Sequence, residues 1–320
     1  MNTTLQKIYE IGIIPVIAIE DANQAVPLAK ALVAGGLPAA EVTFRTAAAE
    51  DAIRAICKEV PDMLVGAGTV LTTEQADRAM AAGATFIVAP GYDPNVTQHV
   101  IDKGGIMVPG TATAGEMQQA MNQGCDALKF FPSEANGGVA MLKNIGAALK
   151  TAKWMCTGGV NAKNVNEYLG YDQIMAVGGT WMCKNDMIKA AKWDEITAIC
   201  KEAVKTMLGF ELAHVGVNCA DEAEAGQTAK TLCAIFGLEY KAGNSSIFAG
   251  KAVECLKKPG RGANGHIAIG TNSVDRAVYQ LSRQGVEFIE DSRVLDPKGR
   301  TKAIYLKQEL SGFAIHLVQK

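Results

Sequence analysis

The sequence predicts an α/β protein, a closed (β/α)8 barrel of the TIM type followed by a small α+β domain. Three observations support this. Up to about residue 207, short β-rich apolar segments alternate with Ala-rich segments whose apolar residues have helical spacing. Eight such units fit within roughly 200 residues, a length that favours a closed barrel over an open doubly wound sheet. From residue 211 the strands become short and alternating, and the pattern βαβββ occurs twice.

The expected barrel strands are continuous apolar runs, as in parallel sheets that helices cover on the outside. In chain order they span residues 13–19, 40–44, 63–66, 85–89, 106–109, 127–131, 153–157 and 174–177. Helices are expected between them at 22–34, 47–60, 73–82, 94–103, 114–123 and 139–150, and an amphipathic helix at 194–207 ends the region. In such a barrel the chemistry collects where the strands end.

In the second region, strands that begin at His214 and His266 each precede a helix, at 221–236 and 274–284, and then three further strands. These two βαβββ modules form the predicted α+β fold. We therefore expect two domains, residues 1–207 and residues 211–320.

The charge balance argues against nucleic acid or membrane as a partner. The chain has 31 basic and 33 acidic residues, a formal net charge of -2, and the charges are interspersed. We expect a small soluble molecule as the ligand. The eight cysteines contain no Cys-x-x-Cys pair, which indicates free thiols in a reducing cytosol. Residues 1–24 lack a signal-peptide pattern and no apolar run approaches the ~18 residues of a membrane span, so a cytoplasmic location is expected.

Lys129 lies in the apolar run Ala-Leu-Lys-Phe-Phe-Pro at residues 127–132, at the end of the sixth strand. Loss of hydration favours its neutral amine, the form that attacks a ketone and forms a Schiff base. The alternative is a lysine whose stem packs on the core while its ammonium group reaches water.

Glu41, Thr43 and Arg45 share one face of the second strand, because side chains alternate with a period of two. A structural Glu41–Arg45 ion pair could explain two of these residues without catalysis. Glycine pairs at 158–159 and 178–179 follow the seventh and eighth strands, where barrels commonly bind phosphate through backbone N–H groups. A phosphorylated substrate is therefore plausible.

The ordered motifs Glu-Val-Thr-x-Arg-Thr, Val-Gly-Ala-Gly-Thr-Val, Lys-Phe-Phe-Pro, Thr-Gly-Gly-Val and Gly-Gly-Thr-Trp resemble the 2-keto-3-deoxy-6-phosphogluconate and 4-hydroxy-2-oxoglutarate aldolase family. The resemblance covers residues 1 to about 207. It implies a class I aldolase on a (β/α)8 barrel, assembled as a homotrimer, that needs no cofactor for its Schiff-base chemistry.

The resemblance also implies roles for individual residues. Lys129 would form the Schiff base and Glu41 would act as general acid and base through a bound water. The expected substrate-binding residues are Arg45 and Thr69 for the carboxylate, Phe131 for the apolar wall, Thr157 for aldehyde stereochemistry, and Gly158, Gly159, Gly179 and Thr180 for the phosphate. Two departures from the family pattern are modest, since Cys156 stands where proline is common and Thr180 where serine is frequent.

The expected reaction is cleavage of 2-keto-3-deoxy-6-phosphogluconate to pyruvate and glyceraldehyde 3-phosphate, and also of 4-hydroxy-2-oxoglutarate to pyruvate and glyoxylate. The iminium on Lys129 accepts the electrons of the broken C3–C4 bond. The alternative substrates are 2-keto-3-deoxy-6-phosphogalactonate and unphosphorylated keto acids.

Three of the four histidines lie in the second domain, at equivalent places in the repeat. His214 and His266 open the first strand of each module, while Glu254 and His316 fall in the last. If the modules pair by an internal two-fold axis, these four side chains converge and suit a divalent metal of unknown identity. The alternative is that the histidines are only packed rings.

Residues 211–320 resemble the vicinal oxygen chelate superfamily, whose fold is glyoxalase-like, most clearly at Gly265-His266-Ile267-Ala268. In glyoxalase the last ligand is a carboxylate, whereas His316 stands here, which argues against glyoxalase activity. The resemblance implies either a metal-dependent isomerase or epimerase, or a non-catalytic ligand-binding module.

Overall fold

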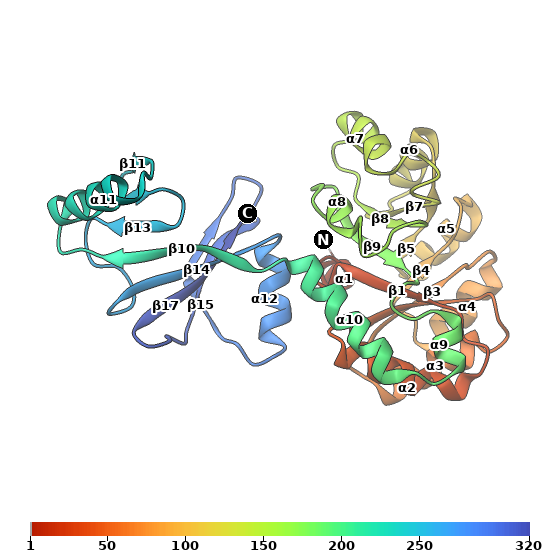
Figure 1. The fold of residues 1–320 in the computed structure, drawn as a ribbon. Coiled ribbons are helices and arrows are strands. Elements are labelled where there is room, and N and C mark those ends of the chain that lie inside the picture. The colour runs from red at the N-terminus through yellow and green to blue at the C-terminus, as the bar shows by residue number, and fades with distance from the viewer. Residues whose placement is uncertain (1) are drawn as a thin grey trace. The chain divides into compact units, whose positions relative to one another are not determined.

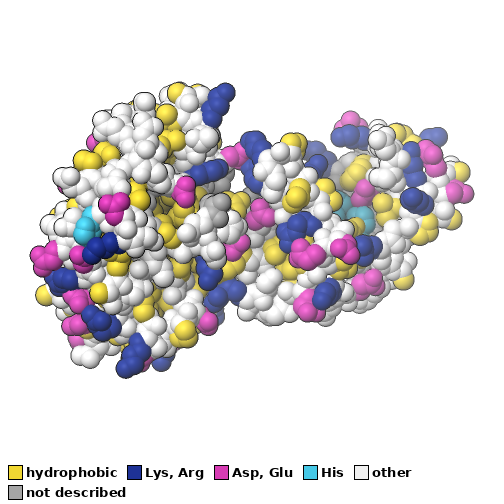
Figure 2. Space-filling view, turned by 180° about the vertical axis from the view of Figure 1, so that it is seen from behind, with side chains coloured by type: hydrophobic (Ala, Val, Ile, Leu, Met, Phe, Trp, Pro, Cys, Tyr) yellow, Lys and Arg dark blue, Asp and Glu magenta, His cyan; other side chains and the backbone are white. Residues whose placement is uncertain are grey.

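The structure is a computed structural model that describes residues 2–320. It divides into two compact units, one ending at Met207 and the other spanning Leu208–Lys320. No helix in the described part of the chain combines the length and apolar character needed to cross a membrane. On the face that Figure 2 shows, basic and acidic side chains are intermixed, in keeping with the near balance of charge in the sequence.

The first unit is the predicted parallel barrel. Its strands are β1 (Ile13–Ile17), β2 (Ala39–Thr43), β3 (Leu64–Gly68), β4 (Phe86–Val88), β5 (Met107–Val108), β6 (Gly110–Thr111), β7 (Leu128–Phe130), β8 (Trp154–Thr157) and β9 (Ile174–Gly179). The ladder runs β5-β4-β3-β2-β1-β9-β8-β7-β6, with every pair parallel. Strands β5 and β6 are two halves of one segment around Pro109, which has no N–H for the ladder. Eight segments therefore close into a ring.

Helices surround these strands (Figure 1). They are α1 (Thr3–Ile11), α2 (Ala25–Ala34), α3 (Ala49–Glu59), α4 (Thr73–Ala82), α5 (Pro94–Asp102), α6 (Ala114–Asn122), α7 (Gly138–Ala148), α8 (Val165–Leu169), α9 (Asn185–Lys189) and α10 (Trp193–Leu208). The helix expected to begin at Ala22 begins instead with a short 3₁₀ turn, Ala22–Gln24, and becomes α-helical at Ala25. Pro27 fits only the first turn of an α-helix, which explains the later start.

Every residue of the barrel strands is buried, including the polar side chains within them. Four of these polar residues are Glu41, Thr43, Lys129 and Thr157, each at most 8% exposed. Buried polar groups need partners inside the protein. The fold therefore concentrates the candidate chemistry inside the ring.

The second unit contains the predicted βαβββ repeat. Its first module is β10 (Glu211–Asn218), α11 (Glu222–Phe236), β11 (Tyr240–Ala242), β12 (Ser246–Ala249) and β13 (Val253–Leu256). The second module is β14 (Gly265–Thr271), α12 (Val274–Ser282), β15 (Phe288–Leu295), β16 (Thr301–Leu306) and β17 (Phe313–Gln319). The sheet order is β11-β12-β13-β10-β14-β17-β16-β15.

The two modules meet through β10 and β14, which pair antiparallel at the centre of the sheet. Outside them, β13 is parallel to β10 and β17 is parallel to β14. The same order of strands thus radiates from the centre in both directions, as an internal two-fold axis requires. This pairing brings the first and last strands of both modules side by side.

Candidate active site and metal centre

Lys129 and Glu41 meet inside the barrel from strands β7 and β2, which are not neighbours in the sheet. The ammonium Nζ of Lys129 donates to Oε1 of Glu41 at 3.0 Å. Lys129 is 5% exposed and Glu41 1%. The ammonium group therefore lies in the interior and does not reach water along its stem. Its Nζ also lies 5.5 Å from the ring centre of Phe131.

The backbone of Lys129 is fixed by the strand segment around Pro109. Its N–H donates to the carbonyl of Pro109 at 2.8 Å, and its carbonyl accepts from the hydroxyl of Thr111 at 3.0 Å. Both bonds come from this one neighbouring segment, and they fix the N–H and the carbonyl of Lys129. The reactive amine thus projects from a rigid strand rather than from a loop.

Glu41 has one oxygen free for chemistry. Its Oε2 is buried and has no hydrogen-bond partner among the described residues. A carboxylate oxygen in this state can accept a bond from a substrate hydroxyl or a water molecule. Gly68 makes room for the group, because a Cβ added there would lie 2.2 Å from Oε1 of Glu41.

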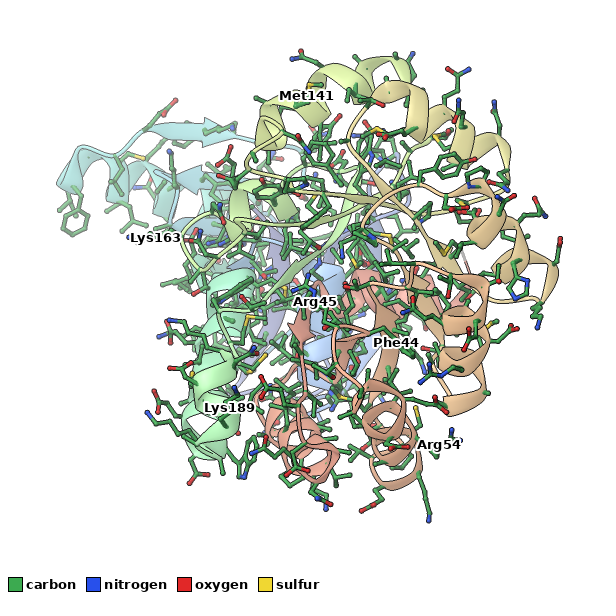
Figure 3. The ribbon with its side chains drawn as sticks, turned by 90° about the vertical axis from the view of Figure 1, so that its right-hand side faces the viewer. Phe44, Arg45, Arg54, Met141, Lys163 and Lys189 are labelled. Atoms are coloured by element: carbon green, nitrogen blue, oxygen red, sulfur yellow. The ribbon has the colours of Figure 1, made fainter. Side chains whose placement is uncertain are left out.

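Arg45 and Thr69 lie just beyond the ends of β2 and β3. These strands are adjacent, with Thr43 in register with Gly68. Arg45 is exposed and forms no ion pair with Glu41, whose carboxylate bonds Lys129 instead. Figure 3 shows Arg45 inside the ring of surrounding helices. The alternative of a structural Glu41–Arg45 pair is therefore wrong, and the guanidinium is available to a ligand.

Two threonines near this pair differ in their local structure. Thr69 has a φ of 56°, a left-handed backbone conformation that disfavours residues other than glycine. Thr43 shares the face of Glu41, but its hydroxyl donates to the carbonyl of Ile17 at 3.0 Å and ties β2 to β1. Strained residues tend to collect at functional sites. Thr69 is thus a candidate for ligand contact, whereas Thr43 has a structural partner.

The expected phosphate-binding residues follow the neighbouring strands β8 and β9. Thr157 is in register with Gly178, and its buried Oγ1 has no partner in the described chain. Gly158 and Gly159 have φ values of 98° and 85°, which only glycine adopts readily. Gly179 is buried at the end of β9 and Thr180 is exposed just after it. The two loops thus emerge side by side at the same end of the barrel.

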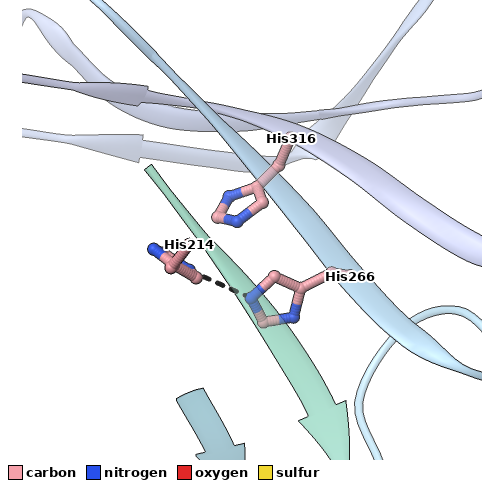
Figure 4. A group of neighbouring side chains, drawn as sticks. All are labelled: His214, His266 and His316. Atoms are coloured by element: carbon pink, nitrogen blue, oxygen red, sulfur yellow. Dashed lines mark hydrogen bonds between the residues drawn. The ribbon is translucent and has the colours of Figure 1, made fainter. Parts of the chain in front are cut away.

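In the second unit, His214 and His266 share one carboxylate oxygen of Glu254. The Nε2 atoms of the two rings lie 3.2 Å and 3.0 Å from Oε2 of Glu254. They lie 3.1 Å from each other, the contact that Figure 4 marks with a dashed line. Burial raises the pKa of Glu254, but the hydrogen bonds from both histidines and from Ser246 outweigh it and hold that pKa well below its usual range. The group is an anion in this setting.

His316 completes the cluster from β17. Its ring centre lies 5.6 Å from that of His214 and 4.8 Å from that of His266. Both of its ring nitrogens are buried and have no hydrogen-bond partner among the described residues. Burial, with the neighbouring imidazoles, lowers the pKa of His316 to about 3, so the ring is neutral. Neutral imidazole is the form that binds metals.

The donor set fits a divalent metal. Ligand atoms of the three histidines lie within 4.8 Å of one another. Two atoms that each bind one ion at about 2.1 Å lie about 3.0 Å apart at a right angle and about 3.4 Å apart in a tetrahedron. The contacts among His214, His266 and Glu254 have this length. No described residue pairs with the two buried ring nitrogens of His316, and a bound metal would give one of them a partner.

Three residues around the cluster were not predicted from the sequence. Ser246 donates to Oε1 of Glu254 at 2.6 Å and orients the carboxylate. Phe248 packs edge-on against His214, with ring centres 5.6 Å apart, and Tyr305 stacks on His316 at 4.6 Å. All three lie on strands adjacent to the cluster residues, so only the strand register could have identified them.

Known proteins resemble the first unit. Residues 5–199 match the family model of the KDPG and KHG aldolases. The chain is 40% identical over 205 residues to the 2-dehydro-3-deoxy-phosphogluconate aldolase of Treponema pallidum, covering 64% of this chain and 98% of that protein. It is equally 40% identical over 205 residues to the KHG/KDPG aldolase of Escherichia coli K12, covering 64% and 96%.

Among solved structures, the KDPG aldolase of Legionella pneumophila, with pyruvate captured as a covalent carbinolamine intermediate, matches with a TM-score of 0.60. It is 37% identical, and the match covers 62% of this chain and 97% of that one.

Proposed function

The chain belongs to the KDPG and KHG aldolase family, and from this premise we propose that its barrel cleaves 2-keto-3-deoxy-6-phosphogluconate to pyruvate and glyceraldehyde 3-phosphate. The chain is a class I aldolase, a lyase that works through a Schiff base. The observation that supports the proposal most strongly is the buried Lys129–Glu41 contact at 3.0 Å. It joins a candidate Schiff-base amine to a candidate proton carrier inside the barrel.

The chemistry follows from this contact. Lys129 must lose a proton before it attacks the C2 ketone, and the carboxylate of Glu41 is near enough to accept it. Addition gives a carbinolamine. Glu41 returns the proton to the carbinolamine hydroxyl, which leaves as water, so that an iminium forms and Glu41 is again a carboxylate. Glu41 then removes the proton of the C4 hydroxyl, the C3–C4 bond breaks, and its electron pair moves into the iminium to form an enamine. Protonation at C3 and hydrolysis release pyruvate and regenerate Lys129.

The proposed binding residues surround this pair. Arg45 and Thr69 would hold the substrate carboxylate, since the arginine fork can bind both oxygens at once. Phe131 would provide the apolar wall against which the pyruvate part packs. Thr157 would contact the aldehyde part, and the loops with Gly158, Gly159, Gly179 and Thr180 would bind the phosphate through backbone N–H groups.

Reductive trapping tests the assignment of Lys129. Borohydride added with pyruvate should reduce the imine and leave a stable adduct, which peptide mass spectrometry would place on Lys129. The variant Lys163→Met, which removes an exposed lysine, is the matched control and should still be labelled. An unmodified Lys129 at saturating pyruvate would refute the proposal.

The range of substrates is part of the proposal. The E. coli relative is named a KHG/KDPG aldolase, so cleavage of 4-hydroxy-2-oxoglutarate to pyruvate and glyoxylate is a second expected activity. The alternatives are 2-keto-3-deoxy-6-phosphogalactonate and unphosphorylated keto acids. A kinetic panel of these acids separates them, since phosphate binding by the two loops should lower KM only for the phosphorylated members.

For residues 211–320 we propose a metal-binding domain of the vicinal oxygen chelate type. Its function is separate from that of the barrel at residues 1–207. The ion would be held by His214, Glu254, His266 and His316. The unpaired ring nitrogens of His316 favour a metal site here. A bound divalent metal would supply a Lewis acid that stabilises negative charge on a ligand oxygen. This chemistry suits an isomerase or epimerase that acts on a related sugar acid.

Metal content tests the domain directly. Protein purified without chelators should hold about one divalent ion per chain by elemental analysis, and His266→Ala should hold less. A chelator should leave barrel cleavage unchanged. Protein without metal would overturn the proposed centre, and intact turnover of every substrate in His266→Ala would instead make the domain a non-catalytic ligand-binding module.

The proposed assembly is a homotrimer, as the family resemblance implies. Light scattering on the eluting protein should give three times the chain mass of 33.7 kDa. A mass of one or two chains would contradict it.

A further inference from the structure

The loop between β13 and β14 joins the strand of Glu254 to the strand of His266, and it is basic. It contains Lys257, Lys258 and Arg261. Lys257 is engaged, because its Nζ forms an ion pair with Glu222 at 2.6 Å. Arg261 is exposed, and its guanidinium forms no ion pair within residues 2–320. Lys258 is also exposed and forms no ion pair in the described part of the chain, so Lys258 and Arg261 are the two free cations of this loop. Of the two, Arg261 contacts an aromatic ring next to the candidate metal centre.

The backbone around Arg261 is held in place by one side chain. Asn218, at the end of β10, accepts from the N–H of Gly260 at 2.8 Å and donates to the carbonyl of Gly262 at 2.7 Å. Gly262 has a φ of 77°, and a Cβ there would lie 2.2 Å from the carbonyl oxygen of Gly265. Arg261 is thus the centre of a tightly fixed Gly-Arg-Gly turn, although its own side chain is exposed.

Tyr305 connects Arg261 to the histidine cluster. The guanidinium carbon of Arg261 lies 5.4 Å from the centre of the Tyr305 ring, and this ring stacks on His316 at 4.6 Å with an angle of 12° between the planes. The guanidinium carbon therefore lies at most about 10 Å from the centre of the His316 ring. An arginine over an aromatic face keeps its in-plane N–H donors available for an anion.

The charges around the cluster favour an anionic ligand. Imidazole binds a metal in its uncharged form, so a divalent ion held by three histidines and one carboxylate keeps a net charge of about +1. Arg261 adds another positive charge nearby. Glu254, the carboxylate in the cluster, has its second oxygen occupied by Ser246. A negative ligand would therefore gain from both the ion and the guanidinium.

We propose that Arg261 determines the specificity of this centre, which takes small organic acids whose carboxylate and neighbouring oxygen bind the metal and whose distal phosphate pairs with Arg261. The proposal deepens the proposed metal-binding function and rests on it. The feature of the ligand that Arg261 recognises is its second anionic group. Asn218 is then a positioning residue, which acts on the ligand only through the turn that it holds.

The test uses the full chain loaded with cobalt(II), whose visible absorption reports only the metal centre. Glycerate and 3-phosphoglycerate form a matched pair of probes, because they share a 2-hydroxy acid and differ by the distal phosphate. The wild type should bind 3-phosphoglycerate at least tenfold more tightly than glycerate. Arg261→Ala should lose about tenfold of this preference, while Arg261→Lys should restore part of it, since the charge remains.

Arg283→Ala is the control, because Arg283 also lies over a tyrosine ring of the same unit, at 5.9 Å from the centre of Tyr279. It should leave the preference unchanged. Equal binding of the two probes by the wild type, or an unchanged preference in Arg261→Ala, would overturn the role of Arg261 and leave the metal centre standing. Failure of cobalt to bind would overturn the metal centre and this inference together.

Discussion

Replacing Lys129 with methionine should expose the energetic cost of the buried pair. Methionine keeps an unbranched apolar side chain in the barrel but leaves the carboxylate of Glu41 without its cation. At the observed 3.0 Å, two unit charges attract by about 5 kcal/mol at an effective dielectric constant of about 20. Breaking a buried ion pair by removing one partner typically costs about 3–5 kcal/mol. We therefore expect Lys129→Met to lower the free energy of unfolding by about 3–5 kcal/mol.

The double variant Glu41→Gln with Lys129→Met separates the charge from the packing. It removes both charges, so it should be more stable than Lys129→Met alone and recover at least half of the loss. Urea unfolding followed by tryptophan fluorescence is the assay. The three tryptophans, Trp154, Trp181 and Trp193, all lie in the barrel unit, so the signal reports that unit alone.

Two results would refute this reasoning. A Lys129→Met protein within 1 kcal/mol of wild type would mean that Glu41, which is 1% exposed, carries no unpaired charge in the variant. A double variant less stable than the single one would mean that packing, not charge, dominates the contact.

Three further predictions concern other parts of the molecule. Gly68→Ala should lower kcat about 100-fold, because the new Cβ would displace Glu41 by contact at 2.2 Å; Gly115→Ala, with open space around its Cβ, is the control, and an equal loss in both would contradict the steric account. Ser246→Ala should weaken metal binding about 10-fold to 100-fold, since the carboxylate of Glu254 loses the bond that orients it. Competition titration with a chelating dye measures this, and an unchanged affinity would argue against Glu254 as a ligand. Glu116→Ala should destabilise the barrel by about 1 kcal/mol at pH 7, because Glu116 accepts bonds from the N–H groups of Ala112 and Thr113 in a capping box. Burial raises the pKa of Glu116, but these bonds outweigh it and bring the pKa below the ordinary 4.5, so the contribution is present above pH 4.5 and is lost as the pH falls through the lowered value. A difference between wild type and variant that widens in acid would show the sign to be wrong.

The barrel could be predicted from the sequence because its signals are local. Apolar strands and helical spacing repeat along the chain, and the positions of the main helices follow from them. Exceptions occur where one residue controls a boundary, as Pro27 does for the start of α2 and Pro109 for the division between β5 and β6. The short helices α8 and α9, with five residues each, have too few turns to show a period.

The contacts of the site were harder to predict, because they depend on distances across the fold. A period of two places Glu41 on an inward face, but it does not indicate that its partner is Lys129, which is 88 residues away. Likewise Ser246, Tyr305 and Arg261 approach the histidine cluster only through strand register and the turn held by Asn218. Such tertiary pairings leave no short-range signal in the chain.

The left-handed backbone of Thr69 has a consequence for engineering. A threonine in this conformation costs about 1–2 kcal/mol relative to a glycine, so Thr69→Gly should raise the heat resistance of the barrel. The same change would delete the hydroxyl proposed to hold the substrate carboxylate. Screening variants for thermal stability alone would therefore select against turnover at this position, and a thermostable catalyst should be sought with residue 69 held fixed.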